Sequence, residues 1–253
     1  MSSGFLDAPV PLAFAHRGFT DGDGTENSMA AFQRAVDLGY RYLETDVRVT
    51  RDGVALAFHD ARLDRVTDRT GRIDELTYAE VRTARIAGRE PIPLLTDVLA
   101  AWPDARINLD VKSEASVAAT ADAVRRTNSL DRICVGSFSD ARIEATRRLL
   151  GPQLCTSIGP RAAFGLRMAS RLGRRPRPTP ARCAQVPARL GRVTFVDARF
   201  LATAHTAGLQ VHVWTINDPV EMRQLLDLGV DGVMTDRADL LRDELARRGS
   251  WAG

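Results

Sequence analysis

The chain has 253 residues, 44% of them hydrophobic, which suffices to bury a large core in one α/β barrel or in two smaller domains. The formal net charge is only +3 although the pI is about 9.0, so the whole molecule is not a polyanion binder and we expect no nucleic-acid partner. Residues 1–11 lack the basic start and apolar run of a signal peptide, and no segment approaches the roughly 18 apolar residues that cross a bilayer. We therefore expect a cytoplasmic protein without stable membrane insertion.

The first part of the chain alternates short apolar strands with helices. Ser28 is a suitable helix cap, and Asp52-Gly53 is typical of a tight turn between two strands. Strands are predicted at 12–15, 42–49, 54–58, 107–112, 132–138 and 154–158, and helices at 28–38, 96–102, 114–127 and 140–150. Residues 60–93, with a short helix at 78–87, are longer and more polar than a barrel connection needs. We interpret this segment as an insertion that folds over the site.

The second part continues the alternation after an ambiguous segment, 160–188, that is rich in arginine and proline. Strands are predicted at 192–196, 211–215 and 230–235, and helices at 200–207, 219–228 and 239–248. Strands that alternate with helices predict a parallel sheet. About eight strands in this length favour a (β/α)8 TIM barrel with a short insertion after the third strand, formed by a single domain over residues 1–253, over an open sheet.

Three cysteines and two of the four histidines show no sequence pattern typical of a functional site. Cys134, Cys155 and Cys183 are an odd number without close spacing, which argues against a disulfide framework and against a zinc cluster. We expect each to be a small buried hydrophobic residue. His205 and His212 are expected to be structural.

Three carboxylates occupy predicted strands in a pattern that indicates a cation site. Glu44 and Asp46 stand two residues apart, so the strand pleat sends both side chains to the same face. Asp110 and Lys112 show the same spacing on a later strand. Because parallel barrel strands end at one mouth, Glu44, Asp46 and Asp110 are predicted to form an oxygen-rich site for one hard divalent cation, with zinc disfavoured.

Two histidines and two further cations are predicted at the same mouth. His16 and His59 each end an apolar strand, which suits an acid/base pair beside the metal. Arg17 and Lys112, the only lysine among 35 basic residues, would face a negatively charged substrate, and phosphate fits this description best. Trp214 is either a core residue or an aromatic wall for the substrate.

Seven short motifs in a fixed order give the sequence a family resemblance. They are His16-Arg17-Gly18, Thr25-Glu26-Asn27-Ser28, Glu44-Thr45-Asp46, Phe58-His59-Asp60, Asn108-Leu109-Asp110-Val111-Lys112, Trp214-Thr215-Ile216-Asn217 and Gly232-Val233-Met234-Thr235-Asp236. Each motif alone is a weak signal, whereas the ordered set from residue 12 to about 241 is a strong one. The chain resembles the glycerophosphodiester phosphodiesterase family.

The resemblance implies a TIM-barrel hydrolase that cleaves small-molecule glycerophosphodiesters to glycerol 3-phosphate and an alcohol, with Mg²⁺ or Ca²⁺. It implies metal ligation by Glu44, Asp46 and Asp110, acid/base catalysis by His16 and His59, and phosphate contacts from Arg17 and Lys112.

The sequence departs from the family pattern at two positions. Many members have glutamate where this chain has Asp110, and the shorter arm leaves the choice of metal open. The family's Pro-Glu-Asn-Thr is replaced by Thr25-Glu26-Asn27-Ser28, which keeps Glu26. We expect Glu26 and Asp60 to lie behind the residues that touch the cation.

Two other functions use overlapping features. The same side chains could perform phospholipase D-type cleavage of lysophospholipid or sphingolipid head groups. A barrel that only binds phosphorylated ligands is a weaker interpretation, because it would need neither the histidines nor the carboxylates together.

The segment 160–188 also has two interpretations. A solvated basic loop after a packing helix is the one the pattern favours. The alternative is an amphipathic helix over residues 162–170 that, with the arginines at 171–177, makes peripheral contact with an anionic lipid surface. Residues 185–187 are expected to line the mouth.

Overall fold

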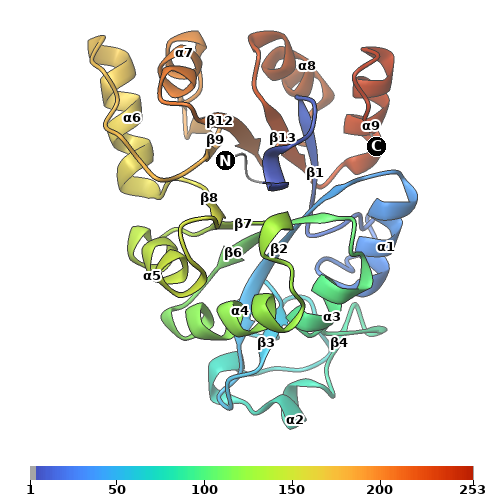
Figure 1. The fold of residues 1–253 in the computed structure, drawn as a ribbon. Helices are drawn as coiled ribbons and strands as arrows, with labels where there is room; N and C mark the ends of the chain where they lie inside the picture. Colours follow the sequence, from blue (N-terminus) through green and yellow to red (C-terminus); the bar gives the residue numbers. More distant parts are fainter. Residues whose placement is uncertain (1–3, 253) are drawn as a thin grey trace.

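Eight parallel strands form a nearly closed barrel in this computed structural model, which describes residues 4–252 (Figure 1). In sheet order they are β8 (Cys155–Thr156), β7 (Ile133–Gly136), β6 (Arg106–Val111), β2 (Tyr42–Val49), β1 (Leu12–His16), β13 (Gly232–Thr235), β12 (Gln210–Trp214) and β9 (Cys183–Pro187). The two end strands meet through the parallel bridge between Ser157 and Cys183. The predicted TIM barrel is therefore confirmed, while residues 1–3 and 253 of the expected domain lie outside the described residues.

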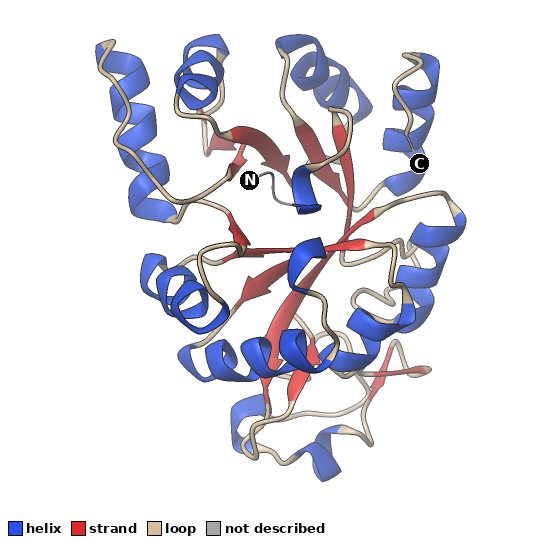
Figure 2. Cartoon of the chain, in the orientation of Figure 1, coloured by secondary structure: helices blue, strands red, loops and turns tan. Residues whose placement is uncertain are grey.

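Helices that follow the strands cover the outside of the barrel (Figure 2). They are α1 (Met29–Asp37), α3 (Leu95–Ala101), α4 (Glu114–Arg126), α5 (Asp140–Leu150), α6 (Pro160–Leu172), α7 (Ala198–Thr206), α8 (Pro219–Leu228) and α9 (Ala238–Arg247). Ser28 caps α1 as predicted, because its side chain accepts the N–H of Ala31. Single-turn 3₁₀ helices cover Gly4–Leu6, Ile73–Glu75 and Leu130–Arg132. None of the helices in residues 4–252 is long and apolar enough to cross a membrane.

The third predicted strand is not a barrel strand. β3 (Ala55–Ala57) pairs antiparallel with the outer end of β2, with Val47 opposite Ala57, so β6 takes the third place in the barrel. The cause is the turn at Asp52-Gly53, which folds the chain back onto β2. His59 therefore reaches the mouth from a hairpin instead of from the end of a parallel strand.

The segment after β3 has a small apolar core of its own. It contains α2 (Tyr78–Val81), which ends well before the predicted residue 87, and the two-stranded ribbon of β4 (Arg85–Ile86) and β5 (Glu90–Pro91). Its buried residues are Leu56, Phe58, Leu63, Ile73, Val81, Ala84, Ile86 and Ile92. This cluster holds the hairpin that carries His59 against the barrel.

The ambiguous segment contains a barrel strand that sequence patterns did not reveal. β9 covers Cys183–Pro187, whereas the strand predicted at 192–196 is half of a surface hairpin made of β10 (Arg189–Leu190) and β11 (Val193–Thr194). β9 is short, contains glutamine and ends in proline, so it lacks the β-branched apolar run that marks the other strands.

The three cysteines meet inside the barrel. Their Sγ atoms all lie within 4.8 Å of one another, and those of Cys134 and Cys183 are 3.8 Å apart. All three side chains are buried, as predicted, and burial raises the pKa of the Cys134 thiol well above its ordinary value. The Cys134 thiol therefore remains protonated, and all three cysteines pack with Phe14 and Tyr42 beneath the mouth.

His212 makes the stability of the fold depend on pH. Its ring is fully buried against Phe14, and burial lowers its pKa from 6.5 to about 3. Because the folded pKa lies below the unfolded one, the group contributes full stability above pH 6.5 and loses it as the pH falls. We expect a loss of about 2 kcal/mol in the free energy of unfolding between pH 6.5 and 5.

Denaturant titrations across this pH range test that expectation. In the variant His212→Leu the slope should flatten by the same amount. The control His205→Gln alters an exposed histidine that pairs with Asp231 at 2.7 Å, and it should leave the buried contribution unchanged. Parallel curves for His212→Leu and the parent chain would show that His212 is not the source.

Candidate active site

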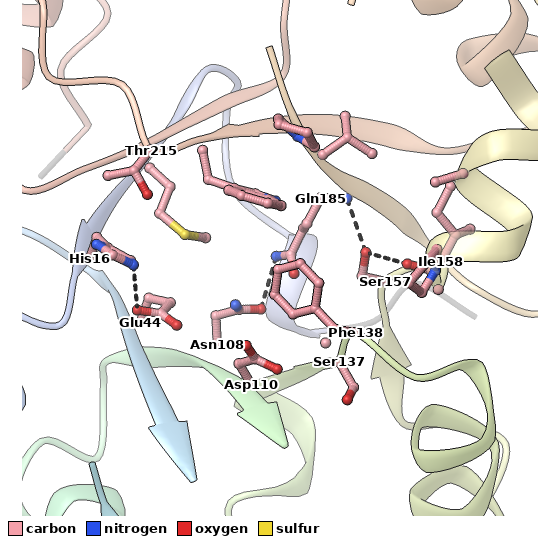
Figure 3. Close-up of a pocket in the computed structure, with 18 of the residues that line it drawn as sticks. His16, Glu44, Asn108, Asp110, Ser137, Phe138, Ser157, Ile158, Gln185 and Thr215 are labelled. Carbon is pink, nitrogen blue, oxygen red and sulfur yellow. Dashed lines mark hydrogen bonds and ion pairs between the residues drawn. The ribbon is translucent and has the colours of Figure 1, made fainter. Parts of the chain in front are cut away.

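A cavity of about 520 Å³ opens at the carboxyl ends of the barrel strands (Figure 3). Eight of the predicted site residues line it: His16, Arg17, Glu44, Asp46, His59, Asp110, Lys112 and Trp214. Figure 3 shows the carboxylate of Glu44 beside the ring of His16, and Asp110 below Asn108 in the same cavity. Residues from β1, β2, β6 and β12, and from the segments that follow β1, β3 and β6, thus meet at one mouth, which is where TIM-barrel active sites lie.

His16 is held between two carboxylates at the end of β1. Its Nδ1 lies 2.6 Å from Oδ1 of Asp236, and its Nε2 lies 3.7 Å from Oε2 of Glu44. Asn217 fixes Asp236 by donating from Nδ2 to Oδ2 at 2.7 Å and accepting the Asp236 backbone N–H at 2.9 Å. Burial alone would lower the pKa of His16, but Glu44 and Asp236 outweigh it and the pKa lies above 6.5. The ring is therefore oriented with Nε2 toward the cavity.

His59 is held by a chain of charged partners. Its Nδ1 lies 2.6 Å from Oδ1 of Asp60, and Oδ2 of Asp60 accepts from Nε of Arg65 at 2.6 Å. Arg65 also donates to both oxygens of Glu26, at 3.0 and 2.6 Å, and Oε1 of Glu26 accepts from Nη1 of Arg17 at 3.0 Å. Glu26 and Asp60 do not line the cavity; each holds a residue that does.

The backbone around Arg17 explains the glycine of the first motif. Arg17 and Asn27 both have left-handed φ angles, of 55° and 58°, and the Asn27 N–H donates to the Arg17 carbonyl at 2.9 Å. This conformation turns the Arg17 N–H onto Oε2 of Glu44 at 3.1 Å. A Cβ on Gly18 would lie 2.6 Å from the carbonyl carbon of Ala31, so only glycine fits there.

The two aspartates share the ammonium group of Lys112. Nζ of Lys112 lies 2.8 Å from Oδ1 of Asp46 and 2.5 Å from Oδ2 of Asp110. The other oxygen of Asp46 accepts from Nδ2 of Asn27 at 3.1 Å and lies 3.1 Å from Nε of Arg17. Asp46 is therefore surrounded by cations and donors, and they hold its pKa below the ordinary value in spite of burial.

The negative charges of Glu44 and Asp110 are less well neutralised by neighbouring cations than the charge of Asp46. Burial, and then the charge of Asp46, raise the pKa of Glu44 to about 7, although His16 opposes this shift. Burial also raises the pKa of Asp110, and its Oδ1 is buried without a hydrogen-bond partner. The site would thus be stabilised by additional positive charge next to these two carboxylates.

The donor set fits a hard divalent cation. The available atoms are carboxylate oxygens, which suit Mg²⁺ or Ca²⁺ better than zinc, and one of them, Oδ1 of Asp110, is buried without a hydrogen-bond partner. Among residues 4–252, ligand atoms of Glu44, Asp46 and Asp110 do not all come within 4.8 Å of one another. The ammonium of Lys112 lies between the two aspartates instead.

The far half of the cavity is apolar. Its lining includes Phe138, Ile158, Pro160, Ala163, Phe164, Val186, Pro187, Leu190, Phe195, Trp214 and Met234. Trp214, which the sequence left open as core or wall, is half-buried and packs edge-on against Phe138 with ring centroids 5.6 Å apart. One cavity is therefore lined by both the charged groups and a large set of apolar side chains.

Sequence reasoning missed three polar residues around the histidines. Asp236 and Asn217 lie inside two of the seven family motifs, and this could have marked them as candidates. Their positions at the ends of strands did not indicate a contact with His16. Arg65 lies in the inserted segment and has no motif of its own. The expected structural histidines, His205 and His212, do not line the cavity.

Comparisons with known proteins identify relatives of this chain. The chain is 44% identical over 253 residues to the probable glycerophosphodiester phosphodiesterase 2 of Mycobacterium tuberculosis, covering 98% of this chain and 96% of the relative. It is 28% identical to the human lysophospholipase D GDPD1, over 91% of this chain and 85% of the relative. A solved Oleispira antarctica phosphodiesterase, in complex with the product sn-glycerol-3-phosphate, has the same fold, with a TM-score of 0.76, 22% identity, and coverage of 94% of this chain and 97% of its own.

These similarities place the chain among the TIM-barrel phosphodiesterases. A family model, the glycerophosphoryl diester phosphodiesterase family, matches residues 16–240. The chain belongs to that family, and the resemblance seen in its motifs is confirmed.

Proposed function

We propose that this enzyme hydrolyses glycerophosphodiesters to glycerol 3-phosphate and an alcohol, with His16 and His59 as its acid/base pair. The observation that carries the proposal is the pair of cavity-facing histidines, each held through Nδ1 by an aspartate at 2.6 Å. Family membership and the product complex of the Oleispira relative support the reaction class.

Glu44, Asp46 and Asp110 would hold a divalent cation, Mg²⁺ or Ca²⁺. When bound, the cation would offset charge on a phosphoryl oxygen. Arg17 and Lys112 line the same cavity and would stabilise the remaining phosphoryl charge. In the structure Arg17 and Lys112 form ion pairs with aspartates. A bound phosphate would replace some of these contacts.

The two histidines would divide the proton transfers. One accepts the proton of the attacking oxygen, from water or from the substrate's neighbouring hydroxyl, as the new P–O bond forms. The other donates a proton to the departing alcohol oxygen as its P–O bond breaks. Hydrogen bonds from Nδ1 to Asp236 and Asp60 leave Nε2 of each ring available for this exchange.

Metal removal tests the proposal directly. We expect dialysis against EDTA to abolish glycerol 3-phosphate release from glycerophosphocholine, and Mg²⁺, Ca²⁺ or Mn²⁺ to restore it to different extents. Full activity in the chelated enzyme would contradict the cation site. Cleavage that releases no glycerol 3-phosphate would contradict the assigned reaction.

The apolar half of the cavity favours a second candidate substrate. A lysophospholipid presents the same phosphodiester with an acyl chain attached, and aromatic and aliphatic side chains such as Phe138 and Phe164 would bury that chain. The human relative is named a lysophospholipase D. Phospholipase D-type cleavage would use the same polar half.

Phe164→Ser should separate the two substrates. We expect kcat/KM for lysophosphatidylcholine to fall about tenfold or more, because the acyl chain would cover the exposed Phe164 and burial of a phenylalanine contributes roughly 1.5–3 kcal/mol. Glycerophosphocholine has no chain to bury, so its kcat/KM should change less than threefold. Equal losses for the two substrates would show that Phe164 does not contact an acyl chain.

A further inference from the structure

The positive charge of the chain is concentrated in one segment. Residues 160–196 contain nine arginines and no aspartate or glutamate, whereas the whole chain has a net charge of only +3. This segment forms α6, β9 and the β10–β11 hairpin. Figure 1 shows α6 at the edge of the barrel, next to α7. One sector of the molecule is thus strongly basic while the remainder is acidic overall.

The outward face of α6 is apolar. Phe164, Met168 and Leu172 follow at intervals of four residues and are 64%, 37% and 56% exposed. Exposed Arg161 and Arg171 belong to the same face by helical spacing. A helix with its aliphatic and aromatic side chains outward, accompanied by arginine, has the composition of an interfacial membrane helix.

The β10–β11 hairpin repeats this combination. Leu190 and Val193 stand directly opposite each other in the ladder and are 55% and 53% exposed. Arg189 and Arg192 are exposed beside them. Within residues 4–252, Arg189 and Arg192 form no ion pair with a carboxylate. The same is true of Arg161 and Arg171 on α6.

A buried arginine joins the helix to the hairpin. Arg167, on the inner face of α6, donates to the carbonyl of Thr194 at 3.3 Å and pairs with Asp197 at 2.8 Å. Phe164 and Leu190 also line the same cavity. Phe164 and Leu190 therefore join the two exposed apolar groups at the mouth, and from there the face continues along α6 to Leu172.

We propose that this face docks the enzyme on an anionic phospholipid bilayer. The docking face consists of Arg161, Phe164, Met168, Arg171, Leu172, Arg189, Leu190, Arg192 and Val193. Its aliphatic and aromatic side chains enter the interfacial layer while the unpaired arginines meet lipid phosphates. Phe164 and Leu190 belong both to this face and to the cavity lining, so a diester with an acyl chain can reach the site along them.

The arginines in the loop after α6 are not part of the proposed docking face. Residues 174–177 lead into the amino end of β9, whereas the cavity lies at the carboxyl ends of the strands. α6 has 13 residues, so about 20 Å separate its two ends. These arginines add long-range attraction to anionic lipid, but the docking contacts lie on α6 and the hairpin.

Vesicle sedimentation tests docking without reference to catalysis. The intact enzyme should pellet with vesicles of 70% phosphatidylcholine and 30% phosphatidylglycerol at 50 mM NaCl, weaken at 300 mM, and stay in solution with pure phosphatidylcholine. Arg171→Gln/Arg192→Gln should lower the partition coefficient about 25-fold, since each basic residue near an anionic surface contributes about fivefold. Met168→Ser/Leu172→Ser should lower it as well, and this loss should persist at all salt concentrations.

The matched control is Arg69→Gln/Arg82→Gln, which removes the same charge from exposed positions in the inserted segment. It should bind vesicles as the parent chain does. All variants should hydrolyse soluble glycerophosphocholine at the parent rate, because none of the altered residues lines the cavity. Docking and hydrolysis can therefore fail separately.

Three outcomes overturn the proposal. The first is no binding to anionic vesicles at 50 mM NaCl. The second is an equal loss of binding in the control variant, which indicates nonspecific charge attraction. The third is a dimer in light scattering that Met168→Ser/Leu172→Ser dissociates, together with no vesicle binding, which assigns the face to a second copy of the chain.

Discussion

Replacing His16 or His59 with alanine is expected to lower kcat for glycerophosphocholine by about 10²–10⁴-fold for each residue. Both side chains line the cavity. Each substitution removes the ring nitrogen that is free to exchange a proton with the substrate. KM should change little, because the phosphate contacts are proposed to come from Arg17 and Lys112. Steady-state release of glycerol 3-phosphate measures the effect.

The fold should survive both substitutions. The two rings are partly exposed at the mouth and do not belong to the apolar clusters of the barrel. Thermal unfolding should therefore shift by no more than a few degrees, and His205→Ala serves as a control outside the site. A variant at His16 or His59 that keeps near-normal kcat would remove that residue from the mechanism.

Asp236→Asn provides a finer measurement of the same mechanism. Asp236 does not line the cavity but holds Nδ1 of His16, so we class it as a positioning residue. An asparagine keeps the shape but can present its amide group to Nδ1, which favours the wrong tautomer. The pH profile of kcat should therefore shift along with its amplitude, which a purely structural role would not produce.

The carboxylates could be placed from sequence because all parallel strands of a barrel end at the same mouth. A residue near the carboxyl end of a strand is therefore expected near that mouth. Glu44, Asp46 and Asp110 lie on β2 and β6, which pair in register with Asp46 opposite Asp110. The two-residue spacing then decides which face each side chain takes.

The missed features depend on contacts between distant segments. β9 has too few β-branched residues to be recognised, and only its pairing with β12 makes it a strand. The meeting of Cys134, Cys155 and Cys183 likewise follows from the register of three strands, which spacing along the chain does not show. Arg65 is linked to the site through Glu26 and Asp60, by side-chain reach alone.

Asp46→Asn is expected to lower both activity and stability. Its carboxylate is buried and lies 2.8 Å from Nζ of Lys112 and 3.1 Å from Nε of Arg17, so an amide leaves two cations undercompensated. Removing one partner of a buried pair typically costs about 3–5 kcal/mol. For a chain of this size the midpoint of thermal unfolding should fall by about 10 °C, as measured by circular dichroism or calorimetry.

The double variant Asp46→Asn/Lys112→Met separates the two effects. Removing the ammonium together with its partner eliminates the unpaired charge, so much of the lost thermal stability should return. Activity should stay absent, because the cation site and a phosphate contact are both gone. The control Asp64→Asn removes an exposed partner of Arg62 and should change stability by less than about 0.5 kcal/mol. If the double variant regains activity along with stability, Asp46 supports the fold alone and the cation site must be assigned to other residues.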